Sequence, residues 1–80
     1  MEEYNSLDTL PTGHSARILA IAGGWGIRQR LLQVGIHVGD VIVMKRCAAL
    51  GGPILLSINN SDIAISRGMA HHIKVGKLET

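Results

Sequence analysis

The sequence predicts a mainly β fold, a small β-barrel or sandwich of about five short strands with one short α-helix inserted after the first strand. Three observations carry this prediction. Short apolar runs recur at close intervals, separated by glycine, asparagine and proline, which is typical of strands joined by tight turns. Only one segment places its apolar residues at helical spacing. A chain of 80 residues has room for one domain with one modest core.

The first predicted strand follows a turn region. Residues 7–13 (LDTLPTG) have the composition of a turn, anchored by two leucines. Residues 14–22 (HSARILAIA) are typical of a strand, and alternation places Ala16, Ile18 and Ala20 on one face. Glycines at positions 23, 24 and 26 end this strand.

The segment IRQRLLQVG is the one predicted helix. Its residues Ile27, Leu31 and Val34 fall at i, i+4 and i+7 and therefore share one face, and Leu32 widens this apolar stripe. Gly35 stands where helices often end in a left-handed residue, and Ile36 follows in the position that packs back on the last turn. A helix of about nine residues does not persist alone, so packing against the strands must hold it.

Four further strands are predicted, at residues 41–47, 54–58, 63–67 and 73–75. The link Asn59–Asn60 tolerates positive φ and favours a tight hairpin turn. By alternation, the predicted inward side chains are Val41, Val43, Ile54, Leu56, Ile58, Ile63 and Ile65, with Ile73 or Val75 completing the set.

Composition and charge exclude or disfavour several classes of protein. The longest apolar run, residues 18–22, is far shorter than the ~20 residues that a membrane-spanning helix needs. The first residues lack the basic and apolar regions of a signal peptide, and the single cysteine allows no internal disulfide, so we expect a cytoplasmic protein. The net charge is only +2, and Trp25 and Tyr4 are the only aromatic residues. Nucleic-acid binding is disfavoured because it usually needs clustered cations and aromatic platforms.

The sequence predicts no enzyme and no dedicated metal site. Cys47 lies within an apolar run, where a thiol is expected to be buried and unreactive. The carboxylates at positions 8, 40 and 62 fall in predicted turns, where such groups commonly bond their own backbone. The histidines do not follow the ligand spacings of zinc sites, and His71 and His72, being adjacent, point apart. We therefore predict no catalytic residue and no cofactor.

Two glycine-rich segments resemble phosphate cradles only superficially. The segment GGWG precedes the predicted helix, but the lysine and hydroxyl residues of a P-loop are missing. The segment ALGGP, residues 49–53, lacks these residues and a following helix, so we interpret it as a bend between two strands. Trp25, alone among glycines, is either a lid over the small core or an anchor for a partner, and the sequence leaves both interpretations open.

The frame from Arg30 to Leu56 resembles the FeoA family. Members show an Arg-Leu pair, a glycine at the helix end, a second glycine four residues later, a strand ending near arginine, and a Leu-Gly-Asp-Pro loop. The matching residues here are Arg30-Leu31, Val34-Gly35, Gly39, Arg46 and Leu50-Gly51-Gly52-Pro53. The resemblance extends in weaker form over residues 7–75. Four positions depart from the pattern, with Val38 and Ala49 where proline is common, Gly52 where aspartate is usual, and Met69 where an acidic residue is frequent.

The resemblance implies an SH3-like barrel, similar to the C-terminal domain of DtxR-type iron-dependent repressors. It also implies a partner, the cytosolic G-protein domain of a FeoB-like membrane transporter of ferrous iron. On this basis we expect a non-enzymatic adaptor that binds this domain and modulates Fe(II) uptake. The expected partner-binding residues are Trp25, Arg28, Leu50, Gly51, Gly52 and Pro53. A contact through the loop aspartate of the family is not available here, because Gly52 replaces it.

Two alternative functions stay open. One is an SH3-like module that associates with nucleic acid or the ribosome, and the other is a metal-sensing domain that uses His71, His72 or Cys47. The expected boundaries are a flexible N-terminus at residues 1–6, a single FeoA-type domain at 7–76 and a C-terminal tail at 77–80.

Overall fold

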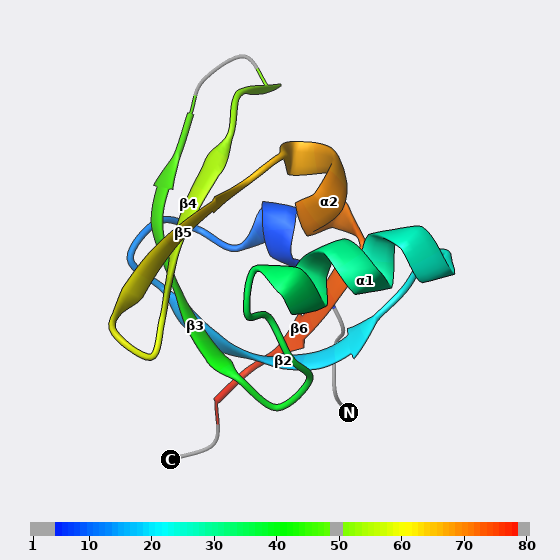
Figure 1. Cartoon of the computed structure of the whole chain (residues 1–80). Coiled ribbons are helices and arrows are strands. Elements are labelled where there is room, and N and C mark those ends of the chain that lie inside the picture. Colours follow the sequence, from blue (N-terminus) through cyan, green and yellow to red (C-terminus); the bar gives the residue numbers. More distant parts are fainter. Residues whose placement is uncertain (1–4, 49–50, 79–80) are drawn as a thin grey trace.

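Six strands form one antiparallel sheet in the computed structural model, which describes residues 5–48 and 51–78 (Figure 1). The strands are β1 (Asn5–Ser6), β2 (Ser15–Ile21), β3 (Val41–Cys47), β4 (Ile54–Ile58), β5 (Ser61–Ile65) and β6 (Ile73–Gly76). Their order in the sheet is β1-β6-β2-β3-β4-β5, so β1 and β5 are its two edges. The 3-10 helix η1 (Leu7–Thr9) and the helices α1 (Trp25–Gln33) and α2 (Arg67–His71) complete the described elements.

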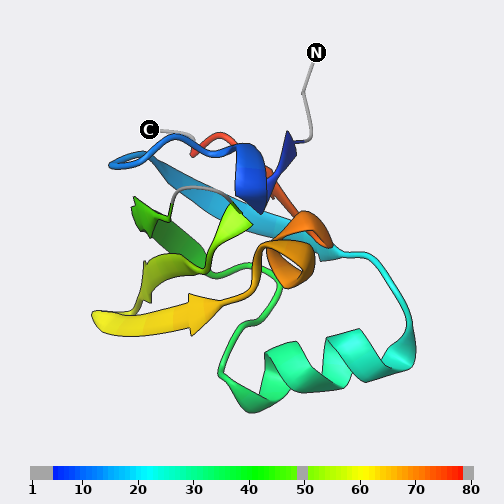
Figure 2. The same ribbon diagram turned by 90° about the horizontal axis from the view of Figure 1, so that it is seen from above.

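The strands curl around one core, and the helices lie at its periphery. Figure 2 shows α1 set to one side of the strands, whereas α2 lies between β5 and β6. The core residues are apolar: Leu7, Ala16, Ile18, Leu31, Ile36, Ile42, Met44, Ile54, Leu56, Ile58, Ile65, Ala70, Ile73 and Val75. Among the described residues, no helix has the length and apolar character needed to cross a membrane.

The predicted mainly β barrel with a helix after the first long strand is confirmed. The helix ends as its sequence predicts, because Gly35 adopts φ +93° and its N–H donates to the carbonyl of Leu32 at 3.0 Å. The N–H of Ile36 donates to the carbonyl of Leu31 at 2.9 Å. These two bonds form a Schellman motif, and Ile36 is buried as expected.

The predicted inward face of β3 is wrong. The structure buries Ile42 and Met44, whereas Val41 is 38% exposed and Val43 is half-buried. Four consecutive apolar residues carry no alternation, so the sequence could not tell one face from the other. Pairing with β2 and β4 decided the register.

The alternation predicted for β2 holds only at its start. Ala16 and Ile18 are buried, but Ala20 is exposed. The pairing of β2 with β6 shifts between Ile18 and Ala20, and a bulge of this kind exchanges the faces of the residues beyond it.

The end of β5 and the helix α2 differ from the prediction of a strand over residues 63–67. The turn occupies only Asn59 and Asn60, at φ 53° and 68°, so β5 begins at Ser61 and ends at Ile65. Ser66 then caps α2, its hydroxyl accepting a hydrogen bond from the Met69 N–H at 3.1 Å. A helix of five residues is too short to show apolar periodicity, which is why the sequence concealed it.

The N-terminal part of the chain also contains a strand that the sequence did not indicate. Asn5 and Ser6, expected within a flexible segment at 1–6, pair with Val75 and Lys74 of β6. Two polar residues show no alternation that would predict a strand. They form a strand here because they pair with the otherwise free edge of β6. Residues 1–4 lie outside the described part of the chain.

Candidate partner-binding surface

Helix α1 presents an exposed face with an aromatic, a cationic and an aliphatic side chain. Trp25 begins the helix and is 77% exposed, Arg28 is exposed, and Leu32 is 46% exposed. These residues stand at i, i+3 and i+7, so they lie on one side of the helix. We call Trp25, Arg28 and Leu32 the α1 outer face.

The opposite side of α1 attaches the helix to the barrel. Leu31 is fully buried and Ile27 packs against the core, as their spacing predicted. Val34, predicted on the same buried stripe, is 44% exposed. Leu32, predicted to widen that buried stripe, is 46% exposed and lies on the outer face instead, seven residues after Trp25.

The exposure of Trp25 excludes one of the two interpretations of this residue, a lid over the core. A lid over the core would bury its ring, whereas 77% of the side chain is exposed. The first turn of α1 contains no acidic residue, and Gly24 supplies no side-chain cap. The partial positive charge at the start of the helix therefore lies near the positive charge of Arg28.

The second group of predicted site residues lies in the connection between β3 and β4. The N–H of Ala48 donates to the carbonyl of Pro53 at 3.1 Å, and Gly51 adopts φ +77°. This confirms the predicted bend between two strands. Gly51 and Pro53 are exposed and Gly52 is half-buried, while Leu50 lies outside the described residues.

The structure does not bring the two groups of predicted site residues together. The β3–β4 connection and the start of α1 lie at separate ends of the molecule in Figures 1 and 2. The residues of each group can contact a partner, but they form two surfaces rather than one.

Cys47, at the end of β3, has an unexpected neighbour. The guanidinium of Arg67 donates from the same nitrogen to the Cys47 sulfur at 3.0 Å and to the Ala48 carbonyl at 2.9 Å. These bonds tie the start of α2 to the end of β3. Cys47 is half-buried, so its predicted burial is only partly correct.

The histidines are not gathered with Cys47. His71 contacts Asp8 through Nδ1, at 3.2 Å from Oδ2, and 65% of its side chain is exposed. Within residues 5–48 and 51–78, no three His, Cys, Asp or Glu side chains are grouped so that they could hold one metal ion. A metal-sensing function would therefore need ligands that this arrangement does not assemble.

Asp8 is the ionisable group whose pKa its surroundings shift most clearly among the described residues. Burial by itself would raise the pKa of the Asp8 carboxyl, but hydrogen bonds from the Ser6 hydroxyl and from His71, with the charge of His71, outweigh burial and lower that pKa. The contact between Asp8 and His71 connects η1 to α2 and involves no residue of the α1 outer face.

The fold and surface define a class of protein, a small SH3-like β-barrel with an exposed aromatic and basic helix face. A family model described as "FeoA domain" matches residues 5–77. The chain belongs to the FeoA family.

Two relatives resemble the chain over most of its length. The "Putative Fe(2+) transport protein A" of Methanocaldococcus jannaschii is 36% identical over 67 residues, which cover 84% of this chain and 79% of that protein. The "Fe(2+) transport protein A/Fe(2+) transporter FeoB fusion protein" of Porphyromonas gingivalis is 32% identical over 69 residues. These cover 86% of this chain but only 8% of the fusion.

Solved structures show the same fold. A crystal structure of an iron uptake regulatory protein, FeoA, has a TM-score of 0.83 and 29% identity, covering 95% of this chain and 99% of that one. A manganese-dependent transcriptional repressor has a TM-score of 0.89 at 15% identity, over 98% of this chain and 44% of the repressor. The second likeness shows a shared barrel and confirms the resemblance of this fold to a domain of metal-dependent repressors.

Proposed function

We propose that this chain is a cytoplasmic, non-enzymatic adaptor of ferrous iron transport that binds the G-protein domain of a FeoB-like transporter. The observation that supports this most directly is the Porphyromonas gingivalis relative, whose name joins Fe(2+) transport protein A and FeoB in one polypeptide. A permanent covalent link holds two partners at high effective concentration, which favours association even at modest affinity.

The α1 outer face is the proposed contact with the G domain. Tryptophan and arginine are the residues most often found at the centre of binding hot spots. Trp25 and Arg28 are both exposed on one helix face here, and Leu32 extends its apolar area. The β3–β4 connection would contribute through the backbone of Gly51 and Gly52, since no charged side chain stands between residues 51 and 53.

Titration calorimetry with the purified G domain of the transporter from the same organism tests this proposal. We expect association at micromolar concentration, measured without nucleotide, with GDP and with a GTP analogue. Trp25→Ala should weaken binding at least about tenfold, because truncating a hot-spot residue usually costs about 2 kcal/mol or more.

Val38→Ala is the matched control, because Val38 is an apolar side chain that is 59% exposed and lies outside α1. Its affinity should equal that of the wild type, and circular dichroism should show that both variants are folded. Absence of binding heat in all three nucleotide states would overturn the proposed partner. Equal weakening by Val38→Ala and Trp25→Ala would overturn the proposed surface.

A further inference from the structure

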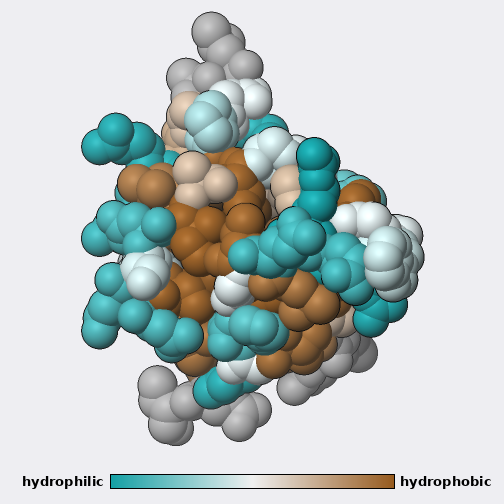
Figure 3. All heavy atoms as spheres, viewed as in Figure 1, coloured by the Kyte–Doolittle hydropathy of each residue, from teal (hydrophilic) through white to brown (hydrophobic). Residues whose placement is uncertain are grey.

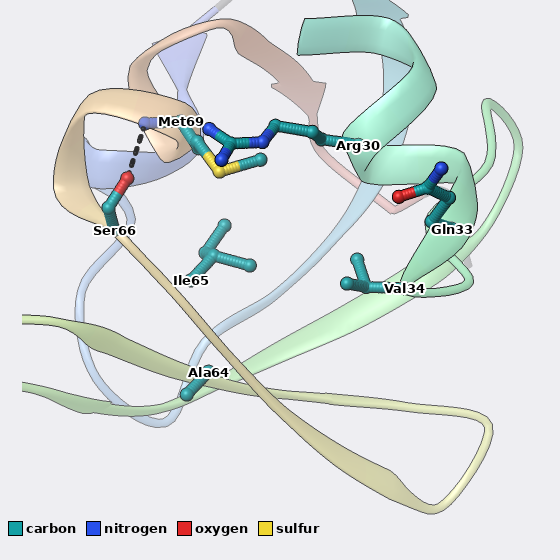
Figure 4. A pocket seen from close by; sticks show the side chains of 7 residues that line it. All are labelled: Arg30, Gln33, Val34, Ala64, Ile65, Ser66 and Met69. Atoms are coloured by element: carbon teal, nitrogen blue, oxygen red, sulfur yellow. Dashed lines mark hydrogen bonds between the residues drawn. The ribbon is translucent and has the colours of Figure 1, made fainter.

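The groove between α1 and β5 differs from the α1 outer face and lies on the other side of the helix. Arg30 and Gln33 of α1 and the C-cap residue Val34 line one side, and Ala64 and Ile65 of β5 and Met69 of α2 line the other. Figure 4 shows Val34 and Ile65 pointing into the space between the two elements, with the Arg30 side chain extending toward Met69. Figure 3 shows apolar surface across this part of the molecule.

One wall of this groove is the free edge of the sheet. β5 pairs with β4 and is the last strand in the sheet order. The turn at Asn59–Asn60 has two residues with positive φ, so Ile58 and Ser61 form a hydrogen-bonded pair. Hydrogen-bonded and non-hydrogen-bonded pairs alternate from there along an antiparallel ladder.

This alternation identifies the unpaired backbone groups. In the observed register, Asp62 faces Ser57 and Ala64 faces Leu55, and both are non-hydrogen-bonded pairs. The N–H and C=O groups of Asp62 and Ala64 therefore point away from β4, toward the open edge. Within the part of the chain that the structure describes, no other segment forms backbone hydrogen bonds with these groups.

We propose that the α1–β5 groove binds an extended polypeptide segment of a partner, which adds to the sheet as a further strand beside β5. The segment would pair with the outward backbone groups of Asp62 and Ala64, as in other strand-addition complexes. This inference concerns a surface different from the proposed G-domain contact and goes beyond that function.

The lining of the groove specifies the chemistry of the segment. Alternate side chains of an added strand would face Val34, Ile65 and Met69. We therefore expect the side chains of the segment that face the groove to be apolar. Arg30 is exposed, and its guanidinium has no hydrogen bond or ion pair among the described residues. A carboxylate on the segment is therefore expected near Arg30, away from the like charge of Asp62.

The shape of the groove favours a chain over other occupants. Its volume of about 240 Å³ is below the roughly 300–1,000 Å³ of ordinary small-molecule sites, and it is open along one side.

A phage-displayed library of random linear peptides of about twelve residues is the probe. We expect selected peptides to alternate apolar and polar residues and to carry at least one acidic residue. Ala64→Pro should weaken their binding at least about tenfold, because it removes an outward N–H that β4 does not use. Ala64→Ser keeps this N–H and should bind like the wild type, and Arg30→Gln should weaken the acidic peptides.

Two further measurements do not depend on the folding of Ala64→Pro. In the first, the odd-numbered or the even-numbered amides of the peptide are N-methylated, and we expect only one of these two sets to lose binding. In the second, the Asp62 and Ala64 amides should exchange more slowly with deuterium when the peptide is bound. Failure to select peptides, affinity that stays unchanged in both N-methylated sets, or protection of these amides by dimerisation without peptide would overturn the proposal.

Discussion

Asp8 shows how one side chain joins two segments that are far apart in the sequence. The Ser6 hydroxyl and His71 both bond its carboxylate, which connects η1 to the last residue of α2. The sequence predicts a carboxylate in a turn that bonds its own backbone, whereas the bond from Ser6 comes from a side-chain hydroxyl. The contact with His71, 63 residues away, could not be predicted, because it depends on α2, which the sequence did not reveal.

The lowered pKa of Asp8 makes the stability of the fold depend on pH. A carboxyl whose folded pKa lies below its unfolded value, near 3.8, stabilises the native state above that value. This contribution falls as the pH decreases through the folded pKa. We therefore expect the difference in unfolding free energy between wild type and Asp8→Asn to shrink as the pH decreases below about pH 4. Urea denaturation from pH 3 to 7 measures it.

Asp62→Asn is the control for this titration. Asp62 is exposed on β5 and has no ion pair among the described residues. Its replacement should change the unfolding free energy little at any pH. A difference between wild type and Asp8→Asn that persists undiminished at pH 3 would contradict the assigned role of the Asp8 carboxylate.

The C-terminal end of helix α1 is determined by the local sequence. Its C-terminal end follows from Gly35 and Ile36, whose Schellman bonds are local and need no tertiary partner. Helix α2 is the opposite case. Its Ser66 cap lacks a glutamate at the third helical position, where Met69 stands, so the signal of a capping box is incomplete.

Gly26 within α1 and Gly35 just after its C-cap give a matched test of the C-terminal end of the helix. Space is open around the position of a Cβ at both Gly26 and Gly35, but only Gly35 has a positive φ, +93°. Gly35→Ala should therefore lower the unfolding free energy by about 1–2 kcal/mol through backbone strain. Gly26→Ala should raise it by up to about 1 kcal/mol, because alanine favours the helix. Thermal and urea denaturation of both variants measure this, and a loss of stability in Gly26→Ala equal to that in Gly35→Ala would contradict it.

The stability of the whole fold depends on a few side chains that attach α1 and the residues just after it to the barrel. Leu31 from the helix and Ile36 just after it enter the core, whereas Leu32 and Val34 remain substantially exposed. An 80-residue domain buries only about 60% of the surface of its unfolded chain, so each of these contacts is a large share of its stability.

Two neighbouring leucines test this dependence. Leu31→Ala should lower the unfolding free energy by about 2–5 kcal/mol, because it removes a fully buried side chain and leaves a cavity. Leu32→Ala removes a side chain that is 46% exposed and should cost less than about 1 kcal/mol. Chemical denaturation of the two variants compares them directly. An equal melting temperature for Leu31→Ala and wild type would show that α1 contributes little to the core.

The candidate site was only partly predictable at this scale. Trp25 and Arg28 could be named from the sequence, but whether Trp25 is a lid or an exposed anchor depended on where α1 sits against the strands. Two further features arise only when the strands have paired into a sheet. One is the separation of α1 from the connection at residues 51–53, and the other is the free edge of β5 beside the α1–β5 groove.

By itself, the sequence determined the β class of the fold, the helix, its end at Gly35 and the Asn59–Asn60 turn, because these depend on local backbone preferences and on apolar spacing. Only the tertiary structure decided the buried face of β3, the two-residue strand β1 and the helix α2. These features are selected by the pairing partners and by burial, and neither leaves a pattern in a run that is uniformly apolar, very short or polar.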